Sequence, residues 1–242
     1  AAGARRRADL RASPPSRIPV RREQPMAVLE FFYDCSSPWT YLAFHRIEEV
    51  AARGGATLVW RPILVGGVFN AVNESVYEQR AHPVMPKLRW YVKDLQDWAS
   101  LYGLRIGQPP VFPVNSVKAM RGAIVLESRG LLPRWSRRVF ETYWGDLRDI
   151  SRDDVLQPLV EELGVDAAEF FAAIADPSVK DRLRANTDEL IARGGFGSPT
   201  MFIDNDDMYF GNDRLVLVEH ALGRKQRAEA SLQVAPAKER TP

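Results

Sequence analysis

Hydrophobic and polar positions follow two different rhythms in the first part of the chain. Residues 28–33 (VLEFFY) form a short apolar run bounded by polar residues, which is typical of a buried strand. Residues 38–53 place apolar side chains at helical spacing, and residues 56–64 (ATLVWRPIL) predict a second strand. A strand, a helix and a strand in close succession predict a β-α-β unit with parallel strands.

The junction between the first strand and the helix has the sequence FFYDCSSPWTYL, residues 31–42. Ser36 or Ser37 is a suitable N-cap, because a serine hydroxyl accepts a hydrogen bond from a free N–H group of the first turn. Pro38 is favoured at the first helical position, where the N–H group that proline lacks would have no partner. A helix is therefore predicted to begin at Pro38 and to end at the two glycines 54–55.

The stretch 75–193 has no strand pattern of comparable strength and predicts a succession of helices. Ser151 begins the segment SRDDVLQPLVEEL, and a serine followed by acidic residues is typical of a helix N-terminus. The predicted helices cover residues 77–102, 116–129, 134–144, a segment from 151, residues 166–176 and a last segment that ends near 193. A block of roughly 120 residues without strands is too long for a loop and must bury its own core.

Strand patterns return toward the end of the chain. Residues 199–203 (PTMFI) and 208–210 (MYF) flank the polar turn DNDD, which favours a hairpin. Residues 211–222 (GNDRLVLVEHAL) predict a closing helix, and the residues after it are interpreted as a frayed tail.

This order of elements predicts an α/β fold: a thioredoxin-like β-α-β…β-β-α sheet with a large all-helical domain inserted. The thioredoxin-like domain is expected to comprise residues 26–74 and 194–223, and the inserted domain residues 75–193. Residues 1–25 are expected to form a disordered basic extension, and residues 224–242 a flexible tail.

Positive charge is concentrated at the start of the chain. Residues 1–25 contain seven arginines against two acidic residues, whereas the whole chain has a net charge of only +2. The mildly acidic remainder has no general attraction for nucleic acid, and no nucleic-acid partner is expected. The basic segment could be an arm that binds nucleic acid, a transit peptide, or sequence upstream of a native start at Met26. The third interpretation is favoured, because Met26 directly precedes the first strand pattern.

The composition excludes several kinds of site. The chain is 45% hydrophobic and 26% charged, as in ordinary globular proteins. Cys35 is the only cysteine, which excludes an internal disulfide and a four-cysteine zinc site. The histidines are far apart in sequence, so no metal is expected: His45, His82 and His220. No apolar run approaches the ~20 residues that span a bilayer, so no membrane partner is expected.

Two places could carry chemistry. The start of the predicted helix presents free N–H groups and the positive end of the helix dipole, which stabilise a thiolate. Cys35 could supply that thiolate, but it precedes the N-cap and lacks a second cysteine, which favours a small hydrophobic residue instead. Ser37 is either an N-cap alone or a hydroxyl directed at a ligand. Pro199, in GSPT, could follow a cis peptide bond and expose the preceding backbone to an extended ligand, or belong to an ordinary turn.

Six motifs occur in an order and at separations that resemble one known family. They are FFYDCSSPWTYL, LVGGVFNAVN, KLRWYVKDLQDWA, YWGDLRDIS, GGFGSPTMFI and GNDRL. From about Ala27 to Leu222, the chain resembles the 2-hydroxychromene-2-carboxylate isomerase family. Members of that family are kappa-class glutathione transferase relatives with the disulfide oxidoreductase A fold. Each motif alone is weak, whereas six in order are specific.

The resemblance implies a glutathione-binding site at particular residues. Ser37 matches the serine that contacts the glutathione sulfur and is the expected catalytic residue. Ser198, before a cis-proline, is expected to pair its backbone with the cysteinyl part of glutathione, and Asp213 and Arg214 to hold the γ-glutamyl end. The full set of expected cofactor-binding residues is Ser37, Pro38, Trp39, Asn73, Ser198, Pro199, Asp213 and Arg214.

Three further residues lie outside this cofactor-binding set. Lys87 and Tyr91 lie one helical turn apart and are expected as substrate contacts, although Tyr91 could equally be a core aromatic residue. Cys35 departs from the family pattern, which usually has an aromatic or apolar residue there. This leaves open a mixed disulfide between Cys35 and glutathione.

The implied function is that of a cytoplasmic, homodimeric enzyme of aromatic catabolism, with glutathione as cofactor and a small aromatic molecule as substrate. The glutathione thiolate would add reversibly to a conjugated aromatic pyruvate and so allow rotation about the former double bond. A kappa-type glutathione transferase or peroxidase would share the same residues and is the main alternative. A disulfide oxidoreductase would need two thiols, and a non-catalytic binding protein is the remaining alternative.

Overall fold

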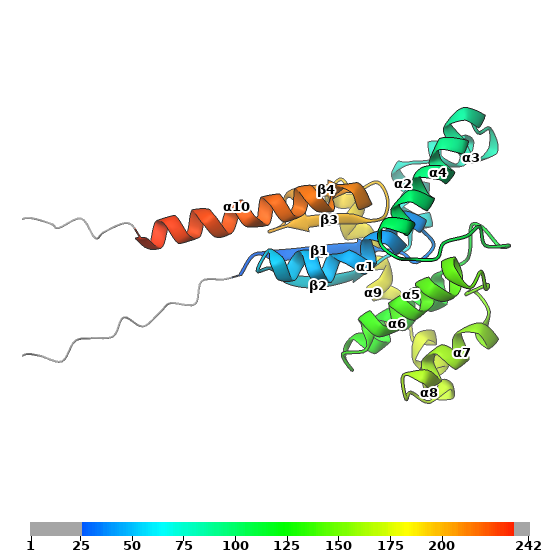
Figure 1. Ribbon diagram of the computed structural model, residues 1–242. Coiled ribbons are helices and arrows are strands. Elements are labelled where there is room, and N and C mark those ends of the chain that lie inside the picture. The colour runs from blue at the N-terminus through cyan, green and yellow to red at the C-terminus, as the bar shows by residue number, and fades with distance from the viewer. Residues whose placement is uncertain (1–25, 235–242) are drawn as a thin grey trace, which may run out of the picture.

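The computed structural model describes residues 26–234, which contain a four-stranded mixed sheet and a large helical block (Figure 1). The strands lie in the order β2-β1-β3-β4. The parallel pairing of β1 with β2 and the antiparallel β3–β4 hairpin confirm both predictions. The strand bounds are β1 Val28–Tyr33, β2 Thr57–Pro62, β3 Thr200–Ile203 and β4 Asp207–Phe210. The predicted α/β thioredoxin-like fold with a helical insertion is therefore confirmed.

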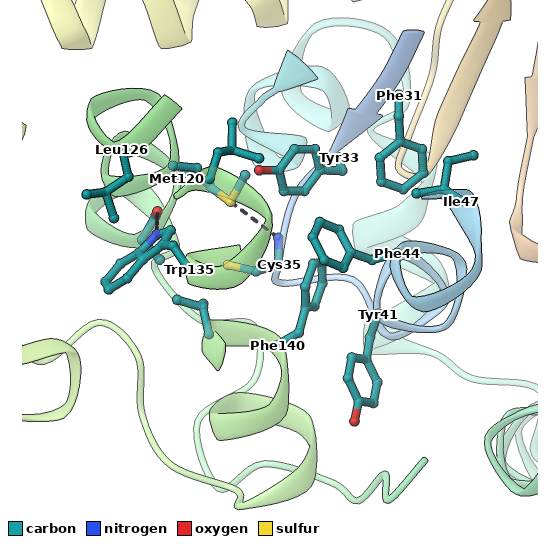
Figure 2. Close-up of a cluster of buried hydrophobic side chains, with 14 of the residues drawn as sticks. Phe31, Tyr33, Cys35, Tyr41, Phe44, Ile47, Met120, Leu126, Trp135 and Phe140 are labelled. Atoms are coloured by element: carbon teal, nitrogen blue, oxygen red, sulfur yellow. Dashed lines mark hydrogen bonds between the residues drawn. The ribbon is translucent and has the colours of Figure 1, made fainter. Parts of the chain in front are cut away.

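The central strand β1 is covered on both faces, which explains its continuous apolar sequence. Because side chains alternate along a strand, Phe31 and Tyr33 belong to the main core, whereas Phe32 belongs to a second cluster with Phe202. Figure 2 shows Phe31 and Tyr33 beside Phe44 of the first helix. The sheet is thus anchored on both sides, and the carboxyl end of β1 is held firmly.

Helix α1, Pro38–Arg53, starts where the sequence predicts. Ser37 is its N-cap and accepts a hydrogen bond from the Thr40 N–H group, while Pro38 occupies the first turn. At the other end, a Cβ atom on Gly54 would lie 2.7 Å from Cβ of Leu222. Glycine is needed there because the closing helix packs against α1 at that point.

The remaining helices lie mostly toward one end of the sheet, whereas α10 runs along it and projects past the opposite end (Figure 1). Their bounds are α2 Val65–Val72, α3 Ser75–Ala81, α4 Met85–Leu101, α5 Val117–Glu127, α6 Leu132–Phe140, α7 Asp153–Glu162, α8 Ala167–Ala175, α9 Pro177–Ala192 and α10 Leu215–Val234. A π-helical turn, η1 Glu141–Gly145, follows α6, and a 3-10 turn, η2 Asn212–Arg214, precedes α10.

Three sequence predictions need correction. The helix predicted over 77–102 is two helices, because Pro83 and Pro86 remove N–H donors and disfavour helical geometry in the preceding residues. Ser151 is not an N-cap: its N–H and hydroxyl both donate to Asp149, and Arg152 holds the cap position without a side-chain bond.

The third correction concerns the end of the chain. The closing helix α10 continues to Val234, past Leu222, so that residues 224–234 are helical where a tail was predicted. Helix α2 was not predicted at all. The predicted basic extension, residues 1–25, lies outside the described residues, as do residues 235–242 of the predicted tail.

Within residues 26–234, no helix is long and apolar enough to cross a bilayer. In the same part of the chain, no group of three or more His, Cys, Asp or Glu side chains is placed to hold a metal ion.

Candidate functional site

The junction between β1 and α1 brings Ser37 to a loop that is distant in sequence. The Ser37 N–H group donates to Asp34 O at 3.2 Å, which closes a tight turn before the helix. The Ser37 hydroxyl accepts from the Thr40 N–H group at 3.3 Å and donates to Ser198 O at 3.0 Å. Ser37 is therefore more than a cap, because its single hydroxyl hydrogen already links the helix start to the loop before β3.

That loop contains the predicted cis peptide bond, Ser198-Pro199, which the structure confirms. The Ser198 hydroxyl accepts from the Asp34 N–H group at 3.0 Å and lies 2.8 Å from the Thr40 hydroxyl. These bonds fix the loop against both the strand end and the first turn of α1. Thr40 was not singled out from the sequence, although it follows the capping Ser37 by three residues and so lies on the same side of the helix. A second cis bond, Phe112-Pro113, was not expected.

Asp34 is a buried carboxylate that holds the junction together. Its oxygens accept from Ser36 N at 2.9 Å, Val65 N at 2.8 Å and the Ser116 hydroxyl at 3.1 Å. Burial raises the pKa of Asp34, and these three donors partly offset that rise. The carboxylate thus ties β1 to the starts of α2 and α5. Two of its partners, Val65 and Ser116, are distant in sequence, and the sequence signal for Asp34 is its place between a buried strand and a helix cap.

Cys35 lies inside the hydrophobic core and not at the surface of the site. Its side chain is 1% exposed and is surrounded by core residues that include Met120 and Phe140 (Figure 2). Its backbone is fixed as well, since Cys35 N donates to Met120 Sδ and Trp144 Nε1 donates to Cys35 O at 2.9 Å. Burial, followed by the nearby Asp34, raises the pKa of the thiol. The interpretation as a small buried hydrophobic residue is supported.

Cys35 is accordingly expected to be inert in the folded protein. A thiol reagent such as 5,5′-dithiobis(2-nitrobenzoic acid) should react with it only after unfolding, because the thiolate is disfavoured and the sulfur is shielded. Cys35→Ala should retain the pH profile of the enzyme. Fast labelling of the native protein, or a mixed disulfide with glutathione detected by mass spectrometry, would contradict this expectation.

Asn73 ends α2 and lies beside the cis-proline loop. Its side-chain amide donates to Phe196 O at 3.1 Å, two residues before Ser198. Asn73 is therefore brought to the same loop as Ser37, and its amide oxygen accepts from the Ser75 hydroxyl.

The two predicted substrate contacts differ in their surroundings. Tyr91 of α4 packs its ring edge against Trp39, with ring centroids 5.4 Å apart. Burial raises the pKa of Tyr91, and the Trp39 side chain partly offsets the rise. Lys87 is exposed, and no hydrogen bond or ion pair links it to another residue in the range 26–234. Only Tyr91 is thus joined to the first turn of α1.

The turn η2 carries the other predicted pair and one residue that was missed. Asp213 and Arg214 are exposed and form an ion pair with each other. Asn212 beside them is 2% exposed, and within residues 26–234 neither its amide nitrogen nor its amide oxygen has a partner in hydrogen-bond geometry, although its side chain acts on the nearby Tyr102 hydroxyl. An unpaired buried amide is costly unless a ligand or water satisfies it. The motif GNDRL contains Asn212, but its burial could not be inferred from the sequence.

Comparisons with known proteins identify a family and several proteins to which the chain is similar. A family model described as DSBA-like thioredoxin domain matches residues 28–223. The 2-hydroxychromene-2-carboxylate isomerase of Pseudomonas putida is 34% identical over 209 residues, which cover 85% of this chain and 98% of that protein. Glutathione S-transferase kappa 1 of Rattus norvegicus is 27% identical over 211 residues, with coverages of 82% and 92%. A solved structure of 2-hydroxychromene-2-carboxylate isomerase superposes with a TM-score of 0.73 at 30% identity, covering 85% of this chain and 98% of that chain.

Proposed function

We infer the function from the family, because the chain belongs to the DSBA-like thioredoxin domain family and is an enzyme of the 2-hydroxychromene-2-carboxylate isomerase group within it. We propose that it is a glutathione-dependent isomerase of 2-hydroxychromene-2-carboxylate type, active in aromatic catabolism. The observation that carries the proposal is the Ser37 hydroxyl, which caps α1 and faces the carbonyl before cis-Pro199. With Cys35 buried, the reacting sulfur must come from a ligand.

The residues at this junction fit glutathione. The γ-glutamyl end carries an ammonium and a carboxylate, and we assign it to Asp213 and Arg214, with the unpaired amide of Asn212 as a third partner. We assign the cysteinyl segment to the Ser198 backbone, whose carbonyl accepts from the Ser37 hydroxyl in the structure, and Asn73 flanks this loop. Pro38 and Trp39 form the adjoining first turn of α1.

When bound, glutathione supplies a thiolate that adds reversibly to a conjugated substrate and permits rotation about the former double bond. The chain's contribution is to lower the pKa of that thiol. The positive end of the α1 dipole and the Ser37 hydroxyl stabilise negative charge at one point. Tyr91 and Trp39 offer an aromatic surface next to this point.

An absorbance assay on 2-hydroxychromene-2-carboxylate, with and without glutathione, tests the proposal. We expect isomerisation that depends on glutathione, and retention of the protein on immobilised glutathione. Conjugation of 1-chloro-2,4-dinitrobenzene without isomerisation would instead favour the kappa-type transferase alternative. No spectral change with glutathione present would contradict the isomerase proposal.

We also propose that the enzyme is a homodimer and that α4 lies at its interface. The first half of α4 leaves large apolar side chains exposed, with Met85 at 50%, Trp90 at 61% and Val92 at 50%. Its charges are self-complementary, because basic residues precede acidic ones along the helix: Lys87, Arg89, Lys93, then Asp94 and Asp97. Two copies of α4 packed antiparallel about a two-fold axis would bring opposite charges together.

Trp90→Glu is expected to convert the dimer into a monomer, because it places a charge in an apolar contact. Sedimentation velocity measures the change. Val216→Glu adds the same charge at an exposed apolar position of α10 and serves as the control. A wild-type protein that sediments as a monomer, or a Trp90→Glu variant that stays dimeric, would contradict this assignment.

A cytoplasmic location completes the proposal. Glutathione acts as a thiol only where the surroundings keep it reduced, and the cytosol maintains that state. Fractionation of cells that express the native gene, followed by immunodetection, tests the location.

A further inference from the structure

Arg80 of α3 is an exposed cation held between two aromatic rings. Its guanidinium carbon lies 5.5 Å from the ring centroid of Phe69 and 5.2 Å from that of Phe112. Within residues 26–234, no carboxylate forms an ion pair with Arg80. Its positive charge is therefore positioned by the rings and is not neutralised by an ion pair within the described part of the chain.

Each of the two rings is connected by contacts to the junction that carries Ser37. Phe69 lies 3.8 Å from the position that a Cβ atom would take on Gly197, directly before Ser198. Phe112 packs on Trp144 at 5.9 Å between centroids, and the Trp144 indole donates to Cys35 O. Arg80 is thus linked through Phe69 to the cis-proline loop, and through Phe112 and Trp144 to the backbone that follows β1.

The charge of Arg80 also reaches two tyrosines near the same junction. Burial raises the pKa of Tyr91, and Arg80 acts in the opposite direction on the phenol. The same holds for Tyr143, whose pKa is raised by burial and is lowered slightly by Arg80. Since Tyr91 packs on Trp39, the positive field extends over the aromatic surface at the start of α1.

We propose that Arg80 binds the carboxylate of the aromatic acid substrate, with the substrate ring against the aromatic side chains around it. This inference rests on the proposed isomerase function and extends it to the choice of substrate. A guanidinium group matches a carboxylate with two parallel hydrogen bonds, and the flanking rings keep its plane in place. The carboxylates of glutathione are the other possible ligands, and the test separates the two sources.

The kinetic test compares Arg80→Gln and Arg80→Lys with Arg134→Gln. Arg134 is an exposed arginine of α6, outside the proposed site and interface, so its variant loses the same charge without losing the ring contacts of Arg80. Arg80→Gln should raise KM for the carboxylated substrate about 10- to 100-fold, which corresponds to the loss of a charge-assisted hydrogen bond. The KM of Arg80→Lys for this substrate should lie between those of the wild type and Arg80→Gln, because an ammonium group keeps the charge but lacks the planar fork of a guanidinium. KM for glutathione and turnover of neutral 1-chloro-2,4-dinitrobenzene should stay within about twofold of wild type.

A binding measurement makes the inference independent of turnover. Tryptophan fluorescence of the wild type and of Arg80→Gln is titrated with 2-hydroxycinnamate, a carboxylated arene, in the presence of S-methylglutathione. Weaker binding to the variant alone supports the inference, even if the wild type proves not to isomerise 2-hydroxychromene-2-carboxylate. Equal binding and an unchanged KM overturn it while leaving the isomerase proposal intact. A raised KM for glutathione in place of the acid would assign Arg80 to the cofactor and overturn it too.

Discussion

Ser37→Ala is expected to lower isomerase turnover about 10- to 100-fold. A hydrogen bond to a charged acceptor contributes about 1.5–3 kcal/mol, and each pKa unit on the thiol corresponds to about 1.4 kcal/mol. Without the Ser37 hydroxyl, the thiol of bound glutathione should titrate one to two units higher, so less thiolate forms at neutral pH. The pH profile of kcat/KM, together with a direct thiol titration of the complex, measures the shift.

The physical reason lies in the single hydrogen of that hydroxyl. In the structure the hydrogen is directed at Ser198 O, and the oxygen accepts from the Thr40 N–H group. A thiolate at the helix start would compete for the same hydrogen. The Ser198 carbonyl would then be free to accept a hydrogen bond from the ligand backbone. The Ser37 hydroxyl would therefore change its acceptor, and Ser198 O its donor, when the ligand binds.

Ser36→Ala is the matched control, because the Ser36 hydroxyl acts on Asp34 and does not cap α1, and the variant keeps the bond from Ser36 N to Asp34 at 2.9 Å. Ser37→Ala should also lose about 1 kcal/mol of stability through the missing N-cap, whereas Ser36→Ala should not. Thermal unfolding separates this loss from the catalytic one. If Ser37→Ala keeps full activity and the wild-type thiol profile, Ser37 is only a cap.

Local chemistry was enough to predict the junction and the hairpin. The segment Ser37-Pro38 specifies a helix start, and a polar turn between two apolar runs specifies β3–β4, because both signals act within a few residues. The cis bond before Pro199 followed from the family resemblance and a loop pattern, since one sequence alone does not distinguish it from a turn.

The features of the fold and the site that could not be predicted from the sequence depend on contacts between distant residues. The partners of Asp34 are contributed by α2 and α5, and Arg80 meets Phe69 and Phe112 only once the helical block has folded. The prediction of a single helix over 77–102 is wrong because the helical periodicity of the sequence continues across Pro83, whereas proline disfavours a helix there. Such errors fall in the part of the chain whose helices bury little, where tertiary contacts do not reinforce the sequence pattern.

The charged cluster around Glu30 combines burial with several ion pairs. Glu30 lies on the central strand with 5% exposure. Arg61 donates to it through two nitrogens at 2.9 and 2.7 Å, and Arg193 at 2.7 Å. Arg193 also lies 3.8 Å from the ring centroid of Phe202 and pairs with Glu189. Because Arg193 directly precedes the glycine-rich loop that leads to Ser198, the cluster anchors that loop to the sheet.

Glu30→Gln is therefore expected to destabilise the protein by about 3 kcal/mol at neutral pH, since it leaves two arginines without a buried counter-charge. Burial alone would raise the pKa of Glu30, but Arg193 and Arg61 outweigh burial and hold the pKa below its ordinary value of 4.5. A lowered pKa in the folded state means that Glu30 contributes its stability above pH 4.5 and loses it as the pH falls through the folded-state pKa. Urea unfolding at pH 7 and at lower pH should show that the difference in the free energy of unfolding between wild type and variant becomes smaller in acid. Glu219→Gln removes an exposed pair with Arg53 and should cost under about 1 kcal/mol, and an equal loss in both variants would refute the role of the Glu30 cluster.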